Sequence, residues 1–202
     1  MTRFFSSLFK TKPNQPIVVV SGLPRSGTSM MMRMLEAGGI PPMTDNLRTA
    51  DDDNPRGYYE LEAVKKMREG NTSWVSQAPG KSVKVITGLL TYLPKGPNYQ
   101  VLFMQRAMEE ILASQRKMLI RRGEDPDKVN DADMAEYFTR HLAQVETWLA
   151  AHPEIAVLKV DYNHLLAEPE PGIHQVNAFL GDRLDEKAML ACIEPGLYRQ
   201  RK

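Results

Sequence analysis

The chain has 202 residues, 42% of them hydrophobic and 25% charged, with a formal net charge of +1, which is typical of one globular domain with a substantial core. The near-neutral charge gives no indication of nucleic-acid binding, and no run reaches the roughly 18 apolar residues of a membrane span. The single cysteine, Cys192, excludes an internal disulfide and fits a reducing compartment. We expect no signal peptide, an N-terminal tail over 1–15, a single domain over 16–202 and a cytoplasmic location; the oligomeric state is not indicated.

Four short strands are predicted, each rich in aliphatic residues and bounded by Gly, Pro or Asn, over 17–21, 83–86, 100–104 and 155–160. Helical periodicity lies between and after them, over 28–37, 107–122, 132–151 and 173–180. Asp131 or Asp133 is expected to cap the third of these helices. Strands that alternate with helices predict an α/β fold, a three-layer domain with a mostly parallel central sheet flanked by helices. Two irregular stretches, 40–56 and 88–98, are long enough to be functional loops.

A glycine-bounded turn, Gly22-Leu23-Pro24-Arg25-Ser26-Gly27-Thr28-Ser29, follows the first predicted strand. The backbone N–H groups of such a turn and of the following helix N-terminus converge on one point and favour a phosphate there. The spacing matches the nucleotide-binding P-loop, G-x-x-x-x-G-K-[ST], except that Thr28 stands at the lysine position. Because that lysine reaches the β- and γ-phosphates in NTPases, its absence favours a phosphate or sulfonate ligand over Mg²⁺ with a triphosphate.

A second candidate anion site follows the strand at 100–104. Arg106 sits at its carboxyl end, and Ser114 lies eight residues later, two turns along the next helix. An arginine and a hydroxyl on one side of a helix suit a second phosphate. The alternative is an ordinary capping arginine and an ordinary helix serine.

Together these motifs resemble the 3′-phosphoadenosine-5′-phosphosulfate (PAPS)-dependent sulfotransferases, which have a P-loop fold. Members carry a P-[KR]-S-G-T-[ST] loop and a strand followed by R-x7-S, here 24–29 and Arg106 with Ser114. A third likeness spans 159–169 and 176–181, matching the family's Y-x-x-L, D/E-P and F-L-G segment. The stretch 54–60 is similar to small bacterial members. The resemblance covers roughly 17–181, in order.

The resemblance implies a role for each matching residue. The 5′-phosphosulfate would be held by Arg25, Ser26, Gly27, Thr28 and Ser29, and the 3′-phosphate by Arg106 and Ser114. Arg25 would also act in catalysis, by stabilising charge on the transferring sulfonate and the leaving oxygen. Further 3′-phosphate contacts would come from the basic C-terminus, Arg199, Arg201 and Lys202, unless these form a solvated tail. The implied partners are this nucleotide and an acceptor hydroxyl or amine that the sequence does not identify.

The general base is not fixed by the resemblance. Cytosolic members use the histidine of a K-T-H segment, and Gly88 stands at that position here. Other branches use a carboxylate after the first helix, for which the candidates are Glu60, Asp45 and Glu62. The rings of the Tyr58-Tyr59 pair are expected to desolvate Glu60 and raise its pKa. Alternatively, Asp45 is a turn former and the two glutamates are exposed charges at a helix start.

Several other residues bear on the reaction. Lys84 either points toward the sulfonate or simply flanks a strand. Of the two tryptophans, Trp74 is expected to contact a ligand and Trp148 to belong to a helix core. No metal is expected, since the four histidines show no ligand spacing and there is no cysteine pair. Two further functions stay open, a binding module for the nucleotide without turnover and a small kinase with an unusual loop.

Overall fold

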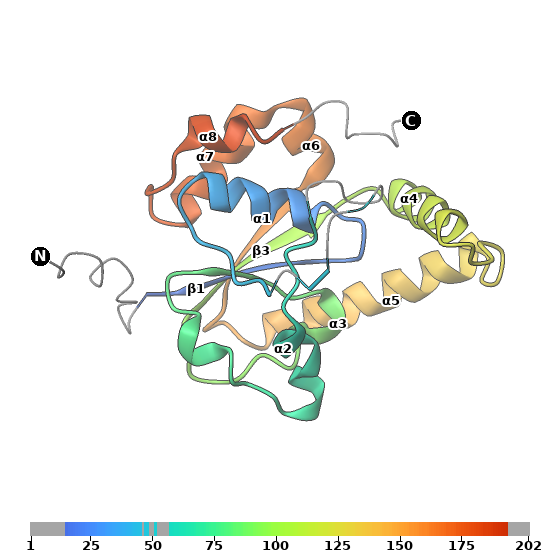
Figure 1. Cartoon of the computed structure of the whole chain (residues 1–202), viewed down its shortest axis with the longest axis horizontal. Helices are drawn as coiled ribbons and strands as arrows, with labels where there is room; N and C mark the ends of the chain where they lie inside the picture. The colour runs from blue at the N-terminus through green and yellow to red at the C-terminus, as the bar shows by residue number, and fades with distance from the viewer. Residues whose placement is uncertain (1–14, 46, 49–50, 52–56, 194–202) are drawn as a thin grey trace, which may run out of the picture.

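The computed structural model describes residues 15–45, 47–48, 51 and 57–193. Within these residues one sheet of parallel strands has the order β2-β1-β3-β4 (Figure 1). The strands are β1 (Ile17–Gly22), β2 (Ser82–Lys84), β3 (Tyr99–Gln105) and β4 (Ala156–Asp161). Helices cover both faces, which confirms the predicted three-layer α/β fold.

The central strand β1 is buried along its whole length. Val19 is paired with Val83 on one side and with Val101 on the other. Successive side chains of a strand point to opposite faces of the sheet, so a strand covered on both faces reads as a continuous apolar run. This burial explains the run of β-branched residues that begins at Ile17.

The first face of the sheet is covered by α1 (Thr28–Ala37), α6 (Tyr162–Ala167), α7 (Pro169–Phe179) and α8 (Glu186–Leu190) (Figure 1). Val18 and Val20 point into this layer, where they share a core with the methionines of α1. Met31, Met32 and Met34 are fully buried there. The methionine run after the glycine turn is therefore helix core.

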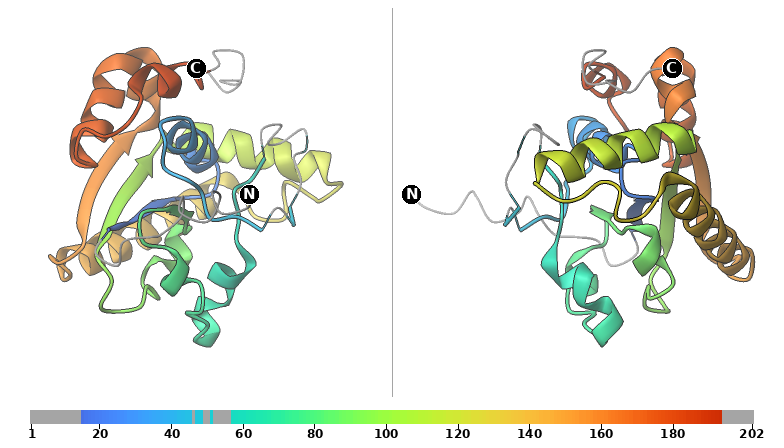
Figure 2. Two further views of the ribbon diagram at one scale, coloured as in Figure 1. Left: turned by 60° about the vertical axis from the view of Figure 1, so that its left-hand side comes forward. Right: turned by 90° about the vertical axis from the view of Figure 1, so that its right-hand side faces the viewer.

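The second face is covered by α2 (Glu62–Lys65), α3 (Thr87–Leu90), α5 (Asp131–Ala150) and two short 3₁₀ helices, η1 (Lys66–Glu69) and η2 (Val75–Gln77). Ile17 and Val19 face this layer together with Trp74 and Phe103. A small additional core of Leu23, Ile111, Leu112 and Phe138 joins α4 (Met108–Arg121) to α5 and to the glycine turn. Figure 1 shows α4 and α5 extending together to one side of the sheet, and the right-hand view of Figure 2 shows both helices from that side.

Several short elements differ from the sequence prediction. Four helices of four to six residues were not expected, α2, α3, α6 and α8, and α3 occupies the start of the stretch 88–98 that was expected to be irregular. The helix expected over 173–180 begins four residues earlier, because Pro169 fits a first helical turn. The cap of α5 is Asn130, whose side chain accepts a hydrogen bond from the Asp133 backbone, and neither predicted aspartate takes that position. Every helix among the described residues is too short or too polar to span a bilayer.

Candidate functional site

The strand order places two predicted motifs at one point of the sheet. The chain adds β2 on one side of β1 and β3 on the other, so the order reverses between β1 and β3. In open parallel sheets, ligands bind at the carboxyl ends of the strands beside such a reversal. The glycine turn follows β1 and Arg106 follows β3, so both lie at this edge.

Both glycines of the turn have positive φ and lie so close to neighbouring residues that a side chain would not fit. Gly22 has φ 153°, and a β-carbon there would lie 2.8 Å from the carbonyl oxygen of Met104. Gly27 has φ 97°, and a β-carbon there would lie 2.7 Å from Cε2 of Tyr162. Gly27 precedes the first turn of α1, whose leading N–H groups have no acceptor within the helix. The turn therefore has the form of an anion-binding loop.

Ser26 provides a further sign of a ligand in this loop. The residue is 1% exposed, and its hydroxyl has no hydrogen-bond partner among the described residues. Buried polar groups are ordinarily paired because an unpaired one costs roughly 1–3 kcal/mol. An anion cradled by the loop would supply the missing acceptor, so the residues present fit a phosphate or sulfonate.

Arg25 connects the two predicted anion sites. Its Nε donates to Ser114 Oγ at 2.8 Å, and its backbone carbonyl accepts from Arg106 Nη1 at 2.9 Å. Residues 81 positions apart in the chain are thus joined directly. The side chain of Arg25 therefore points from the glycine turn toward Ser114 in the second candidate anion site.

Arg106 is held by residues to which the sequence analysis gave no role. Its Nε donates to Glu110 Oε2 at 2.9 Å, and both side chains are less than a tenth exposed. The guanidinium lies over the ring of Tyr162, 4.5 Å from its centroid. Asn163 donates to Glu110 Oε1 at 2.8 Å. The spacing of Arg106 and Glu110, four residues apart at a helix start, was a signal that could have revealed this pair.

Lys84 points into the same edge from β2. Its ammonium donates to Ser29 Oγ at 3.0 Å and to the Tyr58 carbonyl at 2.6 Å. Burial lowers the pKa of Lys84 to about 8, with the charge of Glu60 opposing this shift. Lys84 thus contacts the residue that ends the glycine turn, and does not simply flank a strand.

Glu60 is paired with cations from both sides. Its Oε1 lies 2.9 Å from Arg48 Nη1 and its Oε2 lies 2.9 Å from Lys65 Nζ. Burial raises the pKa of Glu60, but the hydrogen bond from Lys65 and the charges of Arg48 and Lys84 outweigh it, and the net shift is downward. The expectation of a raised pKa was wrong, because it took account of the neighbouring tyrosines and not of these cations.

The other two carboxylates occupy different settings. Asp45 accepts from the backbone N–H groups of Glu62 at 2.7 Å and Leu47 at 3.1 Å. The bond from Glu62 is the main reason that the pKa of Asp45 is lowered. Asp45 thus stabilises the start of α2. It also lies beside Glu60, because the backbone N–H of Asp45 donates to the backbone carbonyl of Glu60. Glu62 is nearly half exposed and pairs with Lys65.

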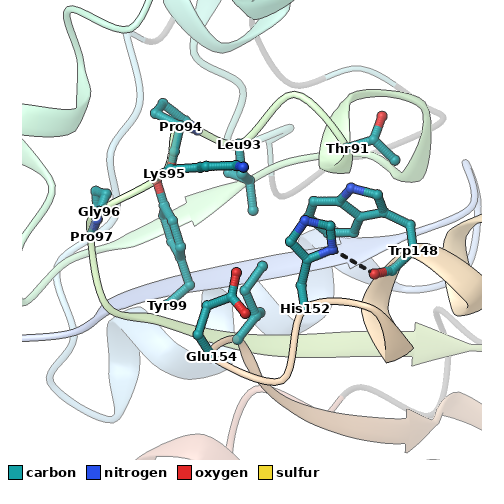
Figure 3. Close-up of a pocket in the computed structure, with 11 residues that line it drawn as sticks. Thr91, Leu93, Pro94, Lys95, Gly96, Pro97, Tyr99, Trp148, His152 and Glu154 are labelled. Atoms are coloured by element: carbon teal, nitrogen blue, oxygen red, sulfur yellow. Dashed lines mark hydrogen bonds between the residues drawn. The ribbon is translucent and has the colours of Figure 1, made fainter.

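Trp74 does not lie where the sequence predicts, whereas Trp148, on α5, packs against the core of the second face as expected. Trp74 is 3% exposed and belongs to the core of the second face. Trp148 is partly exposed and stacks on His152, with ring centroids 4.3 Å apart. The rings of Trp148 and His152 line a cavity of about 220 Å³ with Lys95, Tyr99 and Glu154 (Figure 3). This cavity lies where β3 and β4 begin, at the opposite edge from the glycine turn.

Some predicted positions lie outside the described residues. These are Arg199, Arg201 and Lys202, and the stretch 54–56 of the bacterial-type motif. Among the described residues, no group of three or more histidine, cysteine or acidic side chains is arranged to hold a metal ion.

Comparison with known proteins places the fold. No family model matches the sequence, and no curated protein matches it. The sulfotransferase domain of the Synechococcus PCC 7002 olefin synthase aligns with 98% of this chain and 83% of its own, at 16% identity and a TM-score of 0.56. The sulfotransferase domain of the curacin biosynthetic pathway aligns with 89% of this chain and 78% of its own, at 15% identity and a TM-score of 0.52. The chain has the P-loop-type α/β fold of these sulfotransferase domains.

Proposed function

We propose that this protein is a sulfotransferase that moves a sulfuryl group from PAPS to a hydroxyl or amine acceptor. The observation that carries the proposal is that Arg25, in the glycine turn, forms hydrogen bonds with both Arg106 and Ser114 of the second candidate anion site. PAPS carries one anionic group on each side of its ribose, so it requires two neighbouring anion sites. The buried, unpaired hydroxyl of Ser26 supports an anion in the loop itself.

The residues divide between the two ends of the nucleotide. The loop backbone from Ser26 to Ser29, including Gly27 and Thr28, would hold the 5′-phosphosulfate, and Arg106 and Ser114 would hold the 3′-phosphate. When bound, PAPS supplies an activated sulfuryl group. Arg25 and Lys84 bring positive charge to the loop, where the leaving 5′-phosphate gains negative charge during transfer.

The acceptor must lose a proton as its oxygen or nitrogen bonds to sulfur and the bond from sulfur to the 5′-phosphate oxygen breaks. We assign the proton to Glu60, with Asp45 as the alternative base. The lowered pKa keeps Glu60 ionised at neutral pH. Its nearness to the loop is supported by Lys84, which donates both to Ser29 and to the carbonyl of Tyr58, two residues before Glu60. Asp45 is the weaker candidate, because its oxygens accept backbone hydrogen bonds that hold the start of α2, whereas the partners of Glu60 are the partly exposed side chains of Arg48 and Lys65.

A nucleotide-binding module without turnover is the second candidate function. It is favoured because the carboxylates of Glu60 and Asp45 are already paired, the first with two cations and the second with backbone N–H groups. It is also favoured by the glycine at position 88, where cytosolic sulfotransferases have their histidine base. This function needs the same two anion sites and no base.

One experiment separates the two functions. Wild-type protein, Glu60→Gln and Asp45→Asn are incubated with PAPS and a panel of hydroxyl and amine compounds, and sulfated product is measured by mass spectrometry beside binding of adenosine 3′,5′-bisphosphate (PAP). Transfer by the wild type that one of the two variants loses, with PAP binding retained, supports the enzyme and identifies the base. Binding of PAP with no transfer to any acceptor supports the binding module. Absence of PAP binding overturns both.

A further inference from the structure

We propose that Glu110 is a positioning residue, which fixes the Arg106 guanidinium in the direction needed for the 3′-phosphate of the donor. The inference rests on the proposed function and names a residue at one of the unspecified positions of the R-x7-S motif. Glu110 is an acidic side chain in contact with Arg106, one of the residues proposed to bind the 3′-phosphate. A carboxylate there repels a bound phosphate, so its presence requires a physical reason.

The contacts of Glu110 supply that reason. Its side chain is 8% exposed, and its two oxygens accept from different partners, Arg106 Nε at 2.9 Å and Asn163 Nδ2 at 2.8 Å. Asn163 is in turn fixed by the N–H of Ala107, which donates to its Oδ1 at 3.2 Å. Glu110 therefore ties the start of α4 to the start of α6.

The same contacts fix the plane of the guanidinium. Arg106 is bound at Nε by Glu110, at Nη1 by the Arg25 carbonyl, and on one face by the ring of Tyr162. The five N–H donors of a guanidinium lie in one rigid plane, so these contacts decide where all of them point. A long arginine side chain placed in advance loses less entropy when a phosphate binds.

Two explanations of Glu110 predict opposite results when its charge is removed. If Glu110 only neutralises Arg106, then Glu110→Gln leaves a more positive site and PAP binds more tightly. If Glu110 positions Arg106, then Glu110→Gln weakens the binding of PAP, because the amide can accept from only one of the two donors and presents N–H to the other. Adenosine 5′-monophosphate (AMP) lacks the 3′-phosphate, so its affinity stays the same under the second explanation.

The test is the ratio of the AMP and PAP dissociation constants, measured by calorimetry for wild type, Glu110→Gln, Arg106→Ala and the double variant. We expect Glu110→Gln to lower this ratio about tenfold, the size of one charge-assisted hydrogen bond. It should have no further effect once Arg106 is alanine. The matched control is Glu186→Gln, because Glu186 also accepts from an asparagine, Asn177 Nδ2 at 2.7 Å, but this bond joins the start of α8 to α7. Its ratio should equal that of the wild type.

The outcomes distinguish this inference from the proposed function. A wild-type protein that does not prefer PAP over AMP overturns the proposed function, and the inference with it. A wild-type preference that Glu110→Gln leaves unchanged or increases overturns the inference alone. If Glu110→Gln does not fold, judged by its circular dichroism spectrum, Asn163→Ala replaces it. That variant removes one of the two restraints on Glu110 and is expected to lower the ratio by a smaller factor; an unchanged ratio overturns the inference.

Discussion

Replacing Gly27 by alanine should damage both the stability and the ligand site of this protein. Gly27 has φ 97°, a conformation that costs a residue with a β-carbon about 1–2 kcal/mol. The new methyl group would also lie 2.7 Å from Cε2 of Tyr162, a buried ring that has to move, and overpacking costs about 1–3 kcal/mol. The sum is about 2–5 kcal/mol, or a fall in Tm of about 4–20 °C for a chain of this size. Displacement of Tyr162 also moves Arg106, which lies over its ring.

The assay is thermal unfolding beside PAP titration, with Gly39→Ala as the matched control. Gly39 has φ 105° but open space where a β-carbon would go, so its variant carries the backbone strain without the overlap. We expect Gly39→Ala to lose about 1–2 kcal/mol and to bind PAP like the wild type. If Gly27→Ala is no less stable than Gly39→Ala and binds PAP equally well, the close packing of the loop against Tyr162 is refuted.

The pH profile of kcat/KM should be bell-shaped. Its acid limb should lie below the ordinary glutamate value of 4.5, since the pKa of Glu60 is lowered, and activity should fall as the pH rises through about 8, where Lys84 loses its proton. Lys84→Arg, measured over the same pH range, should remove the basic limb and keep the acid one; a basic limb that persists excludes Lys84 as its source. Asn130→Ala should cost about 0.5–2 kcal/mol in urea unfolding because it removes the cap of α5, whereas Asn130→Ser keeps an acceptor for the Asp133 N–H and should lose less. Equal losses in the two Asn130 variants would contradict the capping role.

The long elements and the loop were predictable because local signals and tertiary structure agree there. The apolar β-branched run from Ile17 is buried on both faces, and α1 spans 28–37 as its glycine boundaries predict. The short helices gave no such signal. The four residues of α2 are stabilised by the distant carboxylate of Asp45, and α6 begins directly after β4 with Asp161 as its cap. Elements of one turn depend on such contacts more than on periodicity.

The charges around the candidate base were not predictable from nearby sequence. Glu60 is adjacent to two tyrosines, which suggested a raised pKa, yet Arg48, Lys65 and Lys84 approach it from three segments and reverse the sign. Trp74 was expected to contact a ligand because its neighbours in the chain are polar, but its ring lies in the core of the second face. Both errors arise where a side chain's neighbours in space differ from its neighbours in sequence.

The most direct test of the account is a calorimetric titration with PAP, beside ATP with and without Mg²⁺. We expect PAP to bind without metal and more tightly than ATP under either condition. Arg106→Ala should weaken PAP by about 10- to 150-fold, since a hydrogen bond to a charged group is worth about 1.5–3 kcal/mol. Tighter binding of ATP with Mg²⁺ than of PAP, or an Arg106→Ala variant that binds PAP as the wild type does, would contradict the assignment of the two joined anion sites to a sulfonucleotide.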